Sequence, residues 1–103
     1  MNRIQRIQKM EQYFDAASEA VNALSDALDK YQEAQKALIK LIEYLDGLMW
    51  IGDFEADEAG KLPKDLKRGV LSEDGLYDLL VKNRIVLAQM ADVVSYSISK
   101  GAL

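Results

Sequence analysis

Apolar residues recur along the first half of the chain with the alternating three-and-four spacing of an amphipathic helix. In heptad notation, the core positions a and d are apolar throughout except at Gln35. Position a falls on Ile7, Phe14, Val21, Leu28, Gln35, Ile42 and Met49, and position d on Met10, Ala17, Leu24, Tyr31, Leu38 and Leu45. This pattern is typical of helices that pack in coiled coils and bundles. It predicts a helix over residues 3–47, with Gly47 at its end.

Position g widens the apolar stripe, because it holds Tyr13, Ala20, Ala27, Ala34, Leu41 and Leu48. Three apolar positions per heptad favour a helical bundle over a two-stranded coiled coil. Gln35 has two interpretations. It either lies at a partly exposed edge of the core or sets the register through a hydrogen bond to a partner helix.

A second stripe, from Leu76 to Ile98, predicts a C-terminal helix over residues 73–99. Ser72 is a favoured N-cap, although Gly75 stands where a capping box has Glu or Gln. The chain is therefore predicted to be a single all-α domain, residues 1–103. Its N-terminal and C-terminal helices are expected to form an antiparallel helical hairpin or bundle.

Residues 48–71 are predicted to form an ordered connector. Pro63 suits the first turn of a helix, so a short helical turn is expected over residues 64–68, closed by Gly69. A small core is expected from Trp50, Leu62, Leu66, Val70 and Leu71. Trp50 is interpreted as a residue that buries over the helix ends, with an aromatic anchor for a partner as the alternative.

Composition excludes several functions. The chain has no Cys and no His, so the commonest nucleophile, general base and metal ligands are missing. No motif indicates an enzyme, a catalytic residue or a cofactor. A net charge of −4 argues against binding to nucleic acid. No apolar run approaches the ~18 residues of a membrane span, and the N-terminus does not resemble a signal peptide. A cytoplasmic protein is therefore expected.

The acidic run within the connector invites comparison with a calcium loop. Asp53, Glu55 and Asp57 imitate the start of an EF-hand, but Glu58 replaces the required Gly and Lys64 the bidentate Glu. We therefore predict no metal site of this type. A solvated acidic turn is the preferred interpretation.

Arg68 is the best candidate for a structural fork in the connector, because guanidinium can bind a carboxylate through two hydrogen bonds. Its possible partners are Asp53, Asp57 and Asp74. A looser site for a small molecule or a divalent metal remains the alternative. The candidate binding residues are Trp50, Asp53, Asp57, Asp65, Arg68 and Asp74.

The connector also carries a distinctive signature. Trp50-x-x-Asp53 is followed by an acidic segment, by Leu62-Pro63-x-Asp65-Leu66-Lys67-Arg68-Gly69-Val70-Leu71-Ser72-Glu73-Asp74 and by Tyr77-Asp78-Leu79-Leu80. This pattern resembles a bacterial family, the domain of unknown function numbered 4298. The resemblance implies a small bacterial cytoplasmic protein with helices on both sides of the motif, and no assigned chemistry. One departure is Leu45 after Tyr44, where a second aromatic residue is expected.

Two classes of function follow from these observations. The first is a protein–protein interaction or scaffold module, with a homodimer formed through the N-terminal helix. The second is the small-molecule or metal site described above. The first is preferred, because the charged side chains of the connector can satisfy one another without a ligand.

Overall fold

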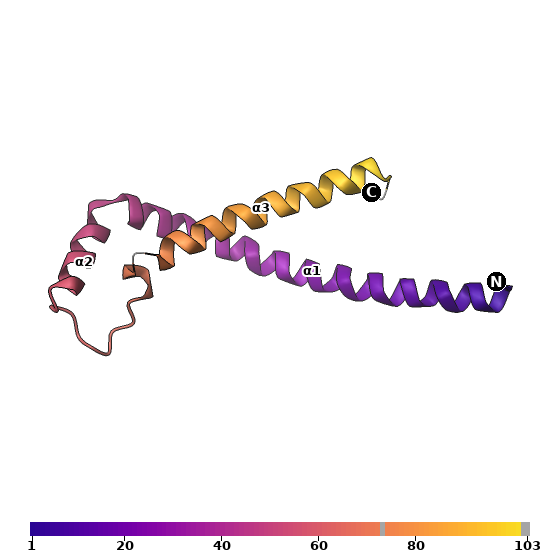
Figure 1. The fold of residues 1–103 in the computed structure, drawn as a ribbon, viewed down its shortest axis with the longest axis horizontal. Helices are drawn as coiled ribbons and strands as arrows, with labels where there is room; N and C mark the ends of the chain where they lie inside the picture. Colours follow the sequence, from indigo (N-terminus) through magenta and orange to yellow (C-terminus); the bar gives the residue numbers. More distant parts are fainter. Residues whose placement is uncertain (73, 102–103) are drawn as a thin grey trace. The chain divides into compact units, whose positions relative to one another are not determined.

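A computed structural model describes residues 1–72 and 74–101. The chain divides into two compact units, Met1–Ile39 and Lys40–Leu103. The described residues form three α-helices and one 3-10 helix, and no strand (Figure 1). The predicted all-α class is confirmed. A long N-terminal helix, a connector with a short helical turn and a C-terminal helix follow one another as expected.

The first unit is a single helical segment. Helix α1, Arg3–Asp46, begins in this unit and continues into the second. Asn2 and Gln5 cap its start reciprocally: the amide of Gln5 donates to Asn2 Oδ1 over 2.8 Å, and the amide of Asn2 donates to Gln5 Oε1 over 3.0 Å. This is the geometry of a capping box, which satisfies two otherwise unpaired N–H groups. None of the side chains of α1 is buried.

Helix α1 was predicted to end at Gly47, and it ends one residue earlier, at Asp46. The Gly47 amide donates to the carbonyl of Glu43 over 3.1 Å, and its backbone is extended, with φ −86° and ψ 169°. A Cβ at this position would lie 3.2 Å from the same carbonyl, so a side chain would crowd the helix end. Gly47 thus closes α1 and immediately precedes the next helix. Met49, expected as the last a position of the stripe, lies in that next helix instead.

The first part of the connector is a helix, where the sequence predicted none. Helix α2, Leu48–Glu58, contains the acidic run that was interpreted as a turn. It ends in a Schellman motif: Gly60 has φ 71°, its amide donates to the carbonyl of Asp57, and the amide of Lys61 donates to that of Ala56, both over 3.0 Å. The glycine that ends this helix is therefore Gly60.

The helical turn predicted over residues 64–68 lies elsewhere. Residues 63–66 form one tight turn, in which the amide of Leu66 donates to the carbonyl of Pro63 over 3.2 Å. The 3-10 helix η1, Gly69–Leu71, follows. The reason for the shift is Arg68, whose backbone leaves the helical region at φ −134° and whose side chain binds the carbonyls of Pro63 and Leu66.

Helix α3, Gly75–Ser99, begins two residues after its predicted start. The N-cap position is Asp74, whose side chain makes no cap hydrogen bond. Ser72 supplies the side-chain bond expected of a cap: its backbone is extended, and its Oγ accepts from the Gly75 amide over 2.9 Å. A Cβ on Gly75 would lie 2.3 Å from that oxygen, which explains why the capping box is incomplete. Gly101, with φ 68°, ends the helix where the sequence indicated. Glu73, the first residue of the predicted C-terminal helix, lies outside the described residues.

The core of the second unit forms around η1, which contacts both α2 and α3. Leu71 and Leu76 are its buried hydrophobic residues, with 6% and 4% of their surfaces exposed. Val70 and Leu66 were also expected to be buried, but they are 41% and 47% exposed, so those predictions were wrong. In the described parts of the chain, no helix combines the length and the apolar character that crossing a membrane would require.

Candidate functional site

Trp50 joins helix α2 to η1. Its indole Nε1–H donates to the carbonyl of Val70 over 2.8 Å, although the two residues are twenty positions apart. Its ring stacks on Phe54, with ring centroids 5.2 Å apart and planes inclined by 18°. Residues four apart lie on the same face of a helix, so Trp50 and Phe54 form one aromatic surface. Trp50 is half-buried, and its polar atom is engaged within the chain.

Tyr44 and Asp53 form a second link, between the end of α1 and the middle of α2. The Tyr44 hydroxyl donates to Asp53 Oδ2 over 2.6 Å. This hydrogen bond, then burial, and then the negative charge of Asp53 raise the pKa of Tyr44 to about 12. All three causes favour the neutral phenol. Tyr44 therefore remains a hydrogen-bond donor at neutral pH and is a poor candidate for a general base.

Arg68 makes the third link and closes the connector onto α2. Its Nη1 lies 2.8 Å from Asp57 Oδ1, and its other guanidinium nitrogens donate to the carbonyls of Pro63 and Leu66. The two charged side chains are 36% and 19% exposed, so the pair is half-buried. Asp57 is thus the partner, out of the three carboxylates considered. The guanidinium spans one carboxylate oxygen and two carbonyls in place of the expected double contact with a carboxylate.

The structure does not assemble the candidate binding residues into one site. Asp53 pairs with Tyr44, whereas Asp57 pairs with Arg68. Asp65 and Asp74 are exposed, and their side chains form no hydrogen bond or ion pair with another described residue. Nowhere in the described parts do three or more carboxylates gather in a way that could hold a metal ion. The arrangement therefore holds the connector together through separate contacts.

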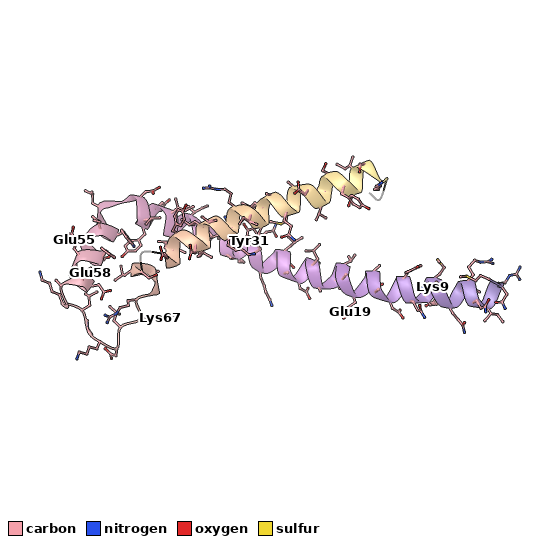
Figure 2. All side chains as sticks on the ribbon, in the orientation of Figure 1. Lys9, Glu19, Tyr31, Glu55, Glu58 and Lys67 are labelled. Atoms are coloured by element: carbon pink, nitrogen blue, oxygen red, sulfur yellow. The ribbon has the colours of Figure 1, made fainter. Side chains whose placement is uncertain are left out.

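Sequence reasoning missed two members of this arrangement, Tyr44 and Phe54. Phe54 could have been found, because it stands four residues after Trp50 and a helix places such residues together. Recognising that pair required recognising α2 as a helix. Tyr44 gave no comparable signal, because its partner Asp53 lies beyond the break at Gly47. Figure 2 shows Glu55 and Glu58 on α2 and Lys67 on the segment leading to η1.

These features define a class: an all-α protein whose two longest helices are separated by a short helix and a connector closed by side-chain hydrogen bonds. The family described as a domain of unknown function, DUF4298, matches residues 7–93. The chain belongs to this family, as its connector signature indicated. No curated protein and no solved structure matches the chain. Family membership assigns no activity to the chain.

Proposed function

We propose that the protein is a helical interaction or scaffold module that forms a homodimer through its N-terminal helix. The observation that carries this proposal is the long uncharged face of α1, here called the seam and defined as heptad positions a, d, e and g of residues 12–45. All charged residues of that segment fall at positions b, c and f: Asp15, Glu19, Asp26, Asp29, Lys30, Glu33, Lys36, Lys40 and Glu43. A face of four positions per heptad is wider than a two-stranded coiled coil requires.

The first unit contains no second element that could cover the seam. It consists of one helical segment, and large apolar side chains such as Phe14, Val21 and Leu24 are 66%, 65% and 54% exposed. Figure 2 shows Lys9 and Glu19 extending from this segment. Helices in proteins gain most of their stability from packing an apolar face. A partner for the seam would therefore stabilise the helix as well as the complex.

The lengths of the helices favour a second copy as that partner. Helix α1 has 44 residues and α3 has 25. At about 1.5 Å per residue, α3 is roughly 28 Å shorter and could cover only part of the stripe on α1. Burying one large apolar side chain contributes about 1.5–3 kcal/mol. Several such side chains together can exceed the cost of association, about 4–15 kcal/mol.

Light scattering of the full chain tests this proposal. The wild-type protein should show about twice its monomer mass of 11.6 kDa at micromolar concentration. Leu24→Asp places a charge on the seam and should weaken the dimer, so the helical circular dichroism of this variant should fall on dilution. Asn22→Asp adds the same charge at position b, outside the seam, and should remain dimeric. A strictly monomeric wild type would contradict the proposal.

The alternative function, a small-molecule or divalent-metal site at the connector, has less support. Asp53 and Asp57 are engaged with Tyr44 and Arg68, and no ligand is needed to satisfy them. A bacterial origin stays a prediction from the family resemblance. A cytoplasmic location stays a prediction from the sequence.

A further inference from the structure

The corner between α1 and α2 presents two apolar side chains to solvent. Leu48 and Met49 are 88% and 75% exposed, the highest values among the large hydrophobic residues described in the second unit. Because α1 ends at Asp46, neither residue lies on the helix that carries the seam. Asp46, the last residue of α1, is exposed and stands two positions before Leu48, so it belongs to the same corner. The corner therefore combines two apolar side chains with a negative charge.

The second unit also contains an open apolar hollow of about 470 Å³. It is lined by Leu41, Lys67, Gly69, Val70, Gly75, Leu76 and Leu79. The glycines leave room in its walls, and Lys67 is the single charged residue in the lining. No described residue forms an ion pair with Lys67. The hollow therefore combines an apolar surface with a positive charge that forms no ion pair with a described residue.

We propose that Leu48 and Met49 of a second copy insert into this hollow, with Asp46 of that copy beside Lys67. Corner and hollow are complementary in both polarity and charge. Each copy carries both the corner and the hollow. In a two-fold symmetric pair the contact therefore forms twice, because the corner of each copy enters the hollow of the other. This inference rests on the proposed self-association and adds a contact that shares only Leu41 with the seam.

A second copy fits the hollow better than a small molecule. Pockets for small molecules enclose about 70–90% of the ligand surface and present a few convergent polar groups. This hollow is open to solvent, and its lining offers mainly aliphatic side chains and glycines. Such a surface suits protruding side chains that are held in place by the rest of a protein partner.

Methyl NMR of labelled methionines can observe both contacts in one spectrum. The chain has four Met residues, of which Met10 lies on the apolar stripe of α1 and Met49 at the corner. If both contacts form, dilution should shift both resonances as the copies separate. Lys67→Glu should give Met49 the resonance of the dilute protein and weaken self-association at least tenfold. Adding Asp46→Lys to that variant should restore the Met49 resonance of the associated wild type and the strength of self-association.

Lys64→Glu is the matched control, because it makes the same charge change in the connector outside the lining of the hollow. It should leave Met49 and the affinity unchanged, and unchanged circular dichroism should confirm that all variants fold. A Met49 resonance that does not respond to dilution, while Leu24→Asp abolishes association, would overturn this inference and leave the proposed function intact. Association that is lost in Lys67→Glu but kept in Leu24→Asp would contradict the proposal that the copies associate through the seam, and it would support the corner contact.

Discussion

The two units of the chain differ in what specifies their structure. In the first unit, Asn2 and Gln5 cap a helix with no buried side chain, and Lys36 pairs with Glu33 only three residues away. In the second unit, side-chain contacts join residues that are 9, 11 and 20 positions apart. The second unit thus contains contacts that fix its own tertiary structure, whereas the first presents an exposed apolar stripe that we propose a second copy covers.

This contrast implies different responses to dilution. Contacts within one chain do not depend on protein concentration, but a seam covered by a second copy does. The contacts of Trp50, Tyr44 and Arg68 within the second unit should therefore contribute the same stability at all concentrations. Measurements on the first unit should vary with concentration, and this difference can be tested residue by residue.

The largest effect is expected in the core of the second unit. Leu76→Ala should lower the free energy of unfolding by about 2–5 kcal/mol, because it leaves a cavity at a residue with 4% exposure. The loss, measured by chemical denaturation, should persist at low protein concentration, where the copies are separated. Leu24→Ala in the seam should instead show a loss that disappears on dilution. If Leu76→Ala is as mild as Leu79→Ala, at a 45% exposed position, the core assignment is wrong.

Arg68→Ala should have the next largest effect. It removes three hydrogen bonds and leaves half-buried Asp57 without its partner, so we expect a loss of about 1.5–3 kcal/mol. The melting temperature should fall, and Arg68→Lys should recover only part of it, because an ammonium group cannot span the same acceptors.

Limited proteolysis with trypsin supplies a second measurement of the same link. The wild-type connector should resist cutting, and Arg68→Ala should become sensitive at Lys61 and Lys64. Lys64→Ala, which removes an exposed positive charge from the same segment, is the control for stability. Rapid cutting of the native wild type at these sites would show that the connector is not closed.

A smaller effect is expected at the start of α3. Ser72→Ala should cost about 1 kcal/mol through the lost cap. Gly75→Ala should cost more, although Ala favours helix, because its Cβ would lie 2.3 Å from Ser72 Oγ. In the double variant part of that clash is removed, so the combined loss should be smaller than the sum of the two. Additive losses, measured by denaturation, would contradict the proposed clash.

The last effect concerns Tyr44 and is confined to alkaline pH. An unfolded tyrosine has a pKa of about 10, and the bond to Asp53 raises the pKa of Tyr44 to about 12 in the folded chain. The stability from this raised pKa is fully present below pH ~10 and is lost as the pH rises towards ~12. Tyr44→Phe should therefore flatten the decline of melting temperature in this range. Tyr77→Phe, at a 63% exposed position, should keep the wild-type profile.

The long helices could be predicted from sequence because their signals are repeated many times. The limits of α1 follow from an uninterrupted stripe and Gly47, and the cap of α3 follows from Ser72. Each of these signals is local. A helix needs only its own residues and its ends to be recognised.

The connector could be predicted less well, because its structure depends on contacts between distant residues. Pro63 and Gly69 favour a helical turn between them, but the guanidinium of Arg68 binds carbonyls that such a turn would use. The acidic run resembles a loop until Trp50 and Phe54 are seen to stack across one turn of helix. The pairing of Arg68 with Asp57, and of Asp53 with Tyr44, likewise joins residues whose proximity only the tertiary structure shows.

The chain contains one tryptophan, and its placement gives the protein an intrinsic optical probe. The indole of Trp50 is hydrogen-bonded to the Val70 carbonyl and stacked on Phe54, so opening the connector would transfer it to water and move its emission to longer wavelength. The first unit has no tryptophan to add to that signal. The emission maximum therefore reports whether the connector is closed without any label.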